Sequence, residues 1–203
     1  MQTVRTDGAV QHMPAIEAET RQTRALGNVM GVARLLIGWE FLWAFLDKTF
    51  GLGYATDTAS AWIHGGSPAS GIMFALTGPF TGFYQTVTGG HAVAGFTAQG
   101  APIGFVPVNT WIDWVYMASM LLIGIGLMTG IMTRIAAIGG IVWMAIFYTA
   151  TFFADGRYNP FYDVHVLTAL VLVGIIVVDA GRYLSLGRYW RRFELVQKHL
   201  ILT

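Results

Sequence analysis

Cysteine is absent from this 203-residue chain, and charged side chains make up only 11% of it. Without cysteine the chain has no disulfide, no cysteine-ligated cluster, no thiol nucleophile and no redox CxxC motif of its own. A soluble domain is typically about one quarter charged, whereas 55% of the residues here are hydrophobic. Much of the surface is therefore expected to face a medium other than water.

Several function classes lack their usual sequence signals. The net charge of +1 gives no nucleic-acid signal, so no nucleic-acid partner is expected. No P-loop, GxSxG or dinucleotide fingerprint occurs, and no pair of histidines has metal-ligand spacing. Only one histidine falls in a long apolar stretch, whereas a bis-histidine haem would need two. We expect no haem, metal or disulfide. The polar first 25 residues predict no cleavable signal peptide.

Four apolar stretches, none interrupted by proline, predict an all-α bundle of four transmembrane helices. A helix needs about 20 apolar residues to cross the hydrocarbon core of a bilayer. The stretches that meet this length are roughly Leu26–Leu46, Trp111–Met132, Ile135–Phe153 and Phe161–Ala180. The lipid bilayer is therefore the first expected partner.

The distribution of basic residues predicts the orientation in a bacterial plasma membrane. Lysine and arginine are enriched in cytoplasmic loops, and none occurs between Thr49 and Thr133. Both termini are therefore expected on the cytoplasmic side. The predicted organisation is a polar cytoplasmic tail (1–25), a membrane domain (26–182) with an extracytoplasmic cap (51–110), and a basic interfacial tail (183–203). The cap should contain short helices, and short strands near its end are left open.

Two charges lie inside the first apolar stretch, where a buried charge is costly. Arg34 and Glu40 are six residues apart, so on one helix they point about 120° apart and do not form a direct ion pair. Each is expected to find its own partner in the bundle, in another subunit or in a ligand. We predict an interior or subunit-facing, hydrogen-bonded position for Glu40. The alternative is that both charges only fix helix packing.

Titratable residues gather at the predicted outer ends of the apolar stretches. Asp47 and Lys48 close the first stretch, while Asp163 and His165 open the fourth. Four helices that end at one level would bring these four side chains together beneath the cap, which predicts a functional site there. Asp113, Tyr116 and Tyr148 are expected at a similar depth. The alternative is ordinary anchoring at the membrane interface.

Several segments resemble the DoxX family of small membrane proteins. They are "FLWAFLDKTFGLGYAT", "AWIHGGSP", "GPF" and "NPFYDVHVLTALVL", in this order. The chain is most similar to the actinobacterial DoxD-like branch, labelled as the large subunit of thiosulfate:quinone oxidoreductase. The resemblance runs from about Arg34 to the C-terminal basic segment and does not include Glu40. It implies a four-helix membrane protein that is associated with redox enzymes and passes electrons to membrane quinone.

A quinone site needs an apolar slot open to the bilayer, polar groups for the two carbonyl oxygens and nearby proton donors. We predict His165 with Asp163 as one hydrogen-bonding and proton-donating pair, and Lys48 beside Asp47 at the other carbonyl. The remaining candidates for cofactor contacts are aromatic or charged side chains near these groups. They are Arg34, Trp39, Glu40, Trp43, Phe45, Trp62 and Tyr162.

A second interpretation of the same features has no catalysis. Aromatic residues at these spacings more often belong to a helix core or to an interfacial belt than to a cofactor site. The chain would then be a scaffold or accessory subunit of a larger respiratory membrane complex, with the cap as its docking surface. Other membrane protein subunits are expected partners under both interpretations.

Overall fold

The computed structural model describes residues 7–70, 80–89, 91–92, 105–106, 110–151, 163–199 and 202. These residues are almost entirely helical, with one antiparallel pair of two-residue strands, β1 (His91–Ala92) and β2 (Phe105–Val106). The longer helices are α1 (Asp7–Phe50), α3 (Thr81–Thr88), α4 (Thr110–Thr129), α5 (Thr133–Thr151) and α6 (Val164–Val177). The short ones are η1 (Thr58–Ser60), η2 (Trp62–His64), η4 (Ala180–Arg182), α7 (Gly187–Trp190) and α8 (Glu194–Lys198).

Three helices are long and apolar enough to cross a membrane. They are the Arg21–Phe50 part of α1, then α4, and the Thr133–Ala150 part of α5. Their outward surfaces are apolar, and Leu122, for example, is 68% exposed, as expected for side chains in contact with lipid rather than water. The chain is therefore a membrane protein by the length and composition of its helices.

The fourth predicted span is shorter than expected. In place of Phe161–Ala180, the structure has α6, an apolar helix of 14 residues. Asp163 caps its first turn by accepting a hydrogen bond from the His165 backbone N–H. After its last turn Asp179 adopts a left-handed backbone conformation with φ 53°, which ends the helix. Residues 152–162, which include the predicted start, lie outside the described part.

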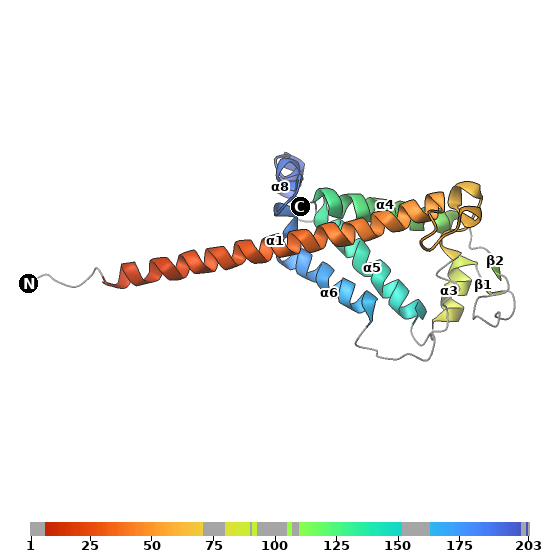
Figure 1. The fold of residues 1–203 in the computed structure, drawn as a ribbon, viewed down its shortest axis with the longest axis horizontal. Helices are drawn as coiled ribbons and strands as arrows, with labels where there is room; N and C mark the ends of the chain where they lie inside the picture. Colours follow the sequence, from red (N-terminus) through yellow and green to blue (C-terminus); the bar gives the residue numbers. More distant parts are fainter. Residues whose placement is uncertain are drawn as a thin grey trace, which may run out of the picture.

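Helix α1 is longer than predicted, because the polar segment assigned to residues 1–25 is helical from Asp7 onward and continues into the apolar part. Figure 1 shows this helix running past the other helices toward the N-terminus.

Glycines set the register between α1 and α4, which run antiparallel. A Cβ added to Gly38 would lie 2.8 Å from the backbone nitrogen of Met128, and one added to Gly124 would lie 2.8 Å from that of Leu42. Small residues at such positions allow the two backbones to approach closely. Counting from these contacts, Arg34 lies beside the last turn of α4, and Lys48 lies level with about Ala118, near the middle of α4.

Helices α5 and α6 pack against the pair formed by α1 and α4. Ile123 of α4 packs on Gly139 of α5, and Leu172 of α6 packs on Gly140, near Phe41. Figure 1 shows α5 and α6 diverging from α1 with distance from the chain's C-terminal segment. We call the end where all four helices meet the base, and the end that carries residues 51–70 the cap end. We call residues 51–70 the cap segment.

Arg34 ties the base together and is completely buried. Its Nη1 donates to the carbonyl oxygens of Leu127 and Met128, in the last turn of α4. Its Nη2 donates to the carbonyls of Tyr183 (3.3 Å) and Leu184 (3.0 Å). The end of a helix leaves carbonyl groups without intrahelical partners, and a cation there is favourable. Arg34 thus closes the C-terminal end of α4 and fixes the segment after η4.

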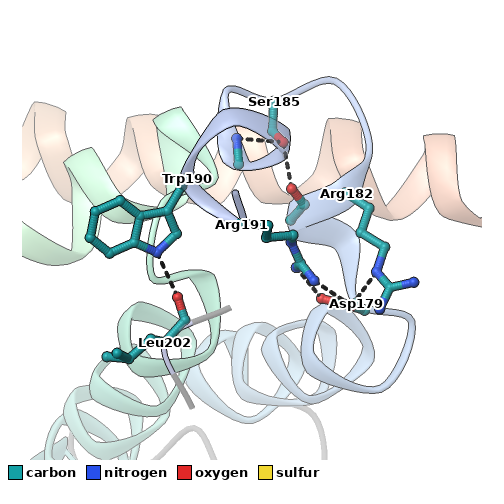
Figure 2. A network of polar contacts seen from close by, with 8 residues as sticks. Asp179, Arg182, Ser185, Trp190, Arg191 and Leu202 are labelled. Atoms are coloured by element: carbon teal, nitrogen blue, oxygen red, sulfur yellow. Dashed lines mark hydrogen bonds and ion pairs between the residues drawn. The ribbon is translucent and has the colours of Figure 1, made fainter. Parts of the chain in front are cut away.

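The C-terminal segment crosses the base and is held by an ion-pair network (Figure 2). Arg191 donates to both carboxylate oxygens of Asp179, from Nη1 at 3.0 Å and from Nη2 at 2.6 Å, and Arg182 donates from Nε at 2.5 Å. Trp190 donates from its indole nitrogen to the Leu202 carbonyl at 2.7 Å. The segment predicted as an interfacial tail is therefore a folded part of the base, with the short helices α7 and α8.

Candidate functional site

Asp47 organises the start of the cap segment. Its carboxylate is buried, and it accepts hydrogen bonds from the backbone N–H groups of Tyr54 and Ala55, each at 3.0 Å. The Gly51 N–H bonds to the Asp47 carbonyl at 2.7 Å. The chain therefore turns back over the end of α1, and the hydrogen bonds to Asp47 hold it in this position. This use of Asp47 is architectural.

Asp113 holds the end of the cap segment by hydrogen bonds, as Asp47 holds its start. Its two carboxylate oxygens accept from the Ser67 hydroxyl and from the Ala69 N–H, both at 2.8 Å. Asp113 lies in the first turn of α4, and it is buried. The cap segment is thus fixed at one end to α1 and at the other to α4, over the gap that opens where α1 stops and α4 continues.

Lys48 lies between these two attachment points and faces two cavities. One is a groove of about 630 Å³ along α1, and the other is a cavity of about 400 Å³ within the cap segment. Lys48 is partly buried. No hydrogen bond joins its ammonium group to any residue that the structure describes. The nearest opposite charge that affects it is that of Asp47, which is occupied by backbone N–H groups.

The groove follows one face of α1 for about 18 Å, from Leu36 to Lys48. Trp39 and Trp43 form its aromatic wall, with ring centroids 5.8 Å apart. Leu36 and Trp39 are exposed, so the groove is open on the side that faces lipid. The described residues that line it are Leu36, Trp39, Glu40, Trp43, Ala44, Asp47, Lys48, Tyr54 and Ala55.

Glu40 contradicts the interior position predicted for it. Its side chain is exposed on the groove face of α1, and it makes no hydrogen bond or ion pair with the described residues. Six residues separate it from Arg34, which turns inward, so the helix rotation that buries Arg34 directs Glu40 outward. The other half of the prediction, that Glu40 faces another subunit, stays a prediction.

The second cavity, within the cap segment, is more polar. Its wall includes Asp57, Ser60, His64 and Ser67 as well as Lys48. The His64 Nδ1 lies 2.6 Å from the Thr58 carbonyl, which leaves the other ring nitrogen available. Asp57 accepts a 2.7 Å hydrogen bond from the Ser60 N–H, and hydrogen bonding from the Ser60 side chain and then from this N–H lowers the pKa of the Asp57 carboxyl. The Lys48 side chain therefore borders both the apolar groove and the polar cavity.

Asp163 and His165 form a pair, but they do not meet Lys48. The Asp163 carboxylate contacts the His165 Nδ1 at 2.8 Å, and the imidazole packs on Phe147 of α5, with centroids 5.7 Å apart. The described residues that line the two cavities at Lys48 belong to α1 and the cap segment. Figure 1 shows the first turn of α6 well apart from the end of α1. The predicted convergence of the four side chains is therefore wrong, because α5 and α6 diverge from α1.

The remaining predicted site residues are dispersed. Arg34 lies at the base and its Nη donors bond to backbone carbonyls, and only Nε lacks a partner among the described residues. Trp62 packs edge-on against Trp114 (4.7 Å), outside the groove. Tyr116 is buried against Trp143 in the core. Phe45 packs against the core, and Tyr162 lies outside the described residues.

Leu36, Ala44, Tyr54 and Ala55 line the groove but were not predicted to do so. The first two share the helical face of Glu40 and Lys48, with spacings of four residues, so helical periodicity alone was sufficient to find them. Tyr54 and Ala55 line the groove because their hydrogen bonds to Asp47 hold the chain back over the end of α1. No local sequence pattern indicates this turn.

Comparisons with known proteins add no relative. No family model matches the chain, and neither a curated protein nor a solved structure matches it.

Proposed function

We propose that the chain is a DoxX-like membrane subunit that binds a quinone in the groove along α1, as part of quinone-linked redox chemistry. The observation that carries this proposal is Lys48: an ammonium group without a hydrogen-bond partner among the described residues, at one end of an apolar, bilayer-facing groove. Ligand pockets commonly have about 300–1,000 Å³ and apolar walls with few polar groups. The groove has this size and composition.

A quinone supplies two carbonyl oxygens and takes up two electrons and two protons when it is reduced. In this proposal Lys48 donates a hydrogen bond to one carbonyl oxygen. Trp39 and Trp43 lie along the ring or the first part of the tail, and Leu36 continues the apolar path toward the base. Asp47 holds Tyr54 and Ala55 in place at the cap end of the groove. Its carboxylate also stabilises the charge on Lys48.

The polar cavity gives Lys48 a second role in the proposal. Because the same side chain borders both spaces, a proton lost from Lys48 can be replaced from the His64 side without passing through lipid. Electrons would come from a sulfur-compound donor on the cap side, as the resemblance implies. The pair of Asp163 and His165 has no part in this arrangement.

The orientation belongs to the same proposal. Among described residues the base and the chain beyond it carry nearly all the basic side chains, and Lys48 is the exception at the cap end. Those at the base end include Arg21, Arg24, Arg134, Arg182, Arg191, Arg192 and Lys198. The positive-inside rule then supports a cytoplasmic base and an extracytoplasmic cap in the plasma membrane.

The test is a binding titration of the purified full-length chain with a short-tailed quinone, read by quenching of tryptophan fluorescence. We expect saturable binding, and we expect Lys48→Met to raise the dissociation constant about tenfold through the lost hydrogen bond to a charged donor. Lys198→Met, at the base, is the matched control. Equal affinity in Lys48→Met and the unaltered chain contradicts the proposal, as does the lack of saturable quenching.

A second function is favoured by Glu40. A carboxyl group that faces lipid without a partner is unfavourable, and a basic side chain of a neighbouring protein would relieve this cost. The groove would then receive a helix of a larger respiratory complex, and the chain would be an accessory subunit.

Affinity purification of the tagged chain from its native membranes separates the two functions. The accessory function predicts that respiratory subunits co-purify in fixed stoichiometry and that Glu40→Gln reduces this yield. Quinone binding by the isolated chain, unchanged by Glu40→Gln, favours the first function.

A further inference from the structure

A second groove lies at the base, outside the functions proposed above. It has about 730 Å³ and is bordered by Met128 and Thr129 at the end of α4 and by residues of the segment that follows α6. Those residues are Arg182, Leu184, Ser185 and Leu186. The described residues that line this groove are different from those that line the α1 groove, so the two spaces are separate features of the fold.

The apolar side of this groove is exposed. Leu184 is 57% exposed and Leu186 is 56% exposed. Phe193 and Tyr189, farther along the same segment, are also exposed. Side chains of this kind are stable at the level where lipid tails meet head groups, and are disfavoured in water.

The direction of Leu184 is fixed by the backbone. Arg34 holds the carbonyl groups of Tyr183 and Leu184 from inside the base. Leu184 has a left-handed backbone conformation with φ 47°. The Leu186 N–H donates to the Thr129 carbonyl at 2.9 Å, which secures the segment to the end of α4. These hydrogen bonds therefore fix the shape of the groove as part of the base.

Arg182 supplies a cation at the edge of the groove. Its side chain is 65% exposed and uses only Nε for Asp179. Asp179 is already paired through both oxygens with Arg191. Figure 2 shows Arg182 at the outer edge of this network. The Nη groups of Arg182 have no hydrogen bond to a described residue, and a planar guanidinium fits phosphate oxygens well.

The sequence around the groove is predominantly positive. Between Val178 and His199 the sequence has five basic residues and two acidic ones, a net charge of 5 − 2 = +3. One of the two acidic residues, Asp179, is neutralised within the network. An anionic ligand is therefore attracted to this end of the molecule, and a cationic ligand is repelled.

We infer that the base groove binds an anionic phospholipid, with its phosphate at Arg182 and the upper part of an acyl chain along Met128, Leu184 and Leu186. A lipid is the occupant that satisfies both halves of the groove, because free phosphate leaves the apolar half uncovered. The base lies where α4 ends, which is the depth of the head groups. The site anchors the C-terminal segment to the membrane surface.

The test uses the full-length chain in detergent and counts bound lipid by native mass spectrometry, with phosphatidylglycerol and phosphatidylcholine offered in separate samples. We expect phosphatidylglycerol to be retained roughly tenfold more than phosphatidylcholine. Arg182→Gln should reduce retention of phosphatidylglycerol to the level of phosphatidylcholine. The matched control, Arg24→Gln, removes an exposed arginine of α1 and should retain the lipid as the unaltered chain does.

Two further arms separate a lipid site from a free-anion site and from a general loss of folding. Leu186→Ala leaves the Asp179 network intact and should also lower lipid retention, so the inference can be tested even if Arg182→Gln fails to fold. Inorganic phosphate and glycerol 3-phosphate at millimolar concentration should not displace the lipid. Displacement by either anion identifies a free-phosphate site and overturns the inference. Equal losses in Arg182→Gln and Arg24→Gln, or no loss in Leu186→Ala, also overturn it.

Discussion

Arg34 and Leu184 are 150 residues apart in the chain, and the guanidinium of the first donates a 3.0 Å hydrogen bond to the carbonyl oxygen of the second. The same side chain bonds to the carbonyls of Leu127, Met128 and Tyr183. One charge inside the base therefore connects α1, the end of α4 and the C-terminal segment.

Replacing Arg34 with methionine should destabilise the whole bundle. Four carbonyl groups lose a charged donor, which we expect to cost about 3 kcal/mol or more. The thermal unfolding midpoint in detergent should fall by roughly 10 °C. Arg24→Met, an exposed position on the same helix, should leave the midpoint unchanged. If both variants unfold at one temperature, the guanidinium does not hold the base together.

Replacing Asp47 with alanine should loosen the cap segment without unfolding the helices. The N–H groups of Tyr54 and Ala55 lose their acceptors, so their amide hydrogens should exchange faster in hydrogen–deuterium exchange. Exchange in α4 and α5 should stay as before. Asp57→Ala is the control within the same segment, because its carboxylate bonds to the amides of Ser60 and Ala59 and not to those of Tyr54 and Ala55. Protected Tyr54 and Ala55 amides in Asp47→Ala would show that another group holds the turn.

Replacing Gly124 with alanine should separate α1 from α4. The added Cβ would lie 2.8 Å from the Leu42 nitrogen and 3.0 Å from its Cα, which are backbone atoms that cannot rotate away. Overpacking of this kind typically costs about 1–3 kcal/mol. Gly82→Ala is the matched control, because no described residue lies within 4 Å of its added Cβ. An unfolding midpoint of Gly124→Ala equal to that of Gly82→Ala would contradict the close approach of the two helices.

The ion-pair network at Asp179 should make the base sensitive to acid. Burial alone would raise the pKa of the Asp179 carboxyl, but the hydrogen bonds and charges of Arg191 and Arg182 outweigh burial and lower this pKa. A carboxyl whose pKa is lower in the folded chain stabilises the fold above its unfolded pKa of about 3.9, and that stability is lost as the pH falls through the folded value.

Unfolding midpoints measured from pH 7 to pH 3 should therefore decline below about pH 4 in the unaltered chain. Asp179→Asn should be less stable at pH 7 and should show a smaller decline, since its side chain does not titrate. Parallel pH profiles for the two proteins would contradict this role of Asp179.

Hydropathy predicted the helices well where the apolar runs end at strong local signals. The span expected over Trp111–Met132 is α4, which ends at Thr129 because Gly130 follows with φ 77° and donates to the Gly126 carbonyl. The span expected over Ile135–Phe153 corresponds to α5, which begins two residues earlier, at Thr133, and continues to the last described residue before the gap, Thr151. The fourth span was overestimated, since Asp179 lies inside the apolar run but adopts a left-handed conformation.

The depth of the charges was misjudged for a different reason. Counted along its own apolar run, Arg34 falls in the middle third of the first span, whereas its contacts place it beside the end of α4. Depth depends on the register with a neighbouring helix, and Gly38 and Gly124 set that register. A glycine in an apolar run indicates that some helix approaches closely, but it does not identify which residue of which helix.

The site itself was predictable only on α1. Lys48 and Trp43, both predicted as site residues, line the groove. The meeting of Lys48 with Asp163 and His165 assumed four straight helices of equal height. The angles between α1, α5 and α6 depend on how side chains pack across the bundle, such as Phe41 of α1 and Leu172 of α6 around Gly140 of α5. A single sequence does not encode these angles in any local pattern.

The acceptors of Arg34 also impose an order on biosynthesis. The helix that carries this arginine is made before α4, and the carbonyl groups that its Nη2 requires, those of Tyr183 and Leu184, are made later still. Until those residues leave the ribosome, the nascent first helix contains a cation that only α4 and water can solvate. Membrane insertion and final closure of the base must therefore be separate events, and a polypeptide that stops short of Leu184 stays an incompletely assembled intermediate.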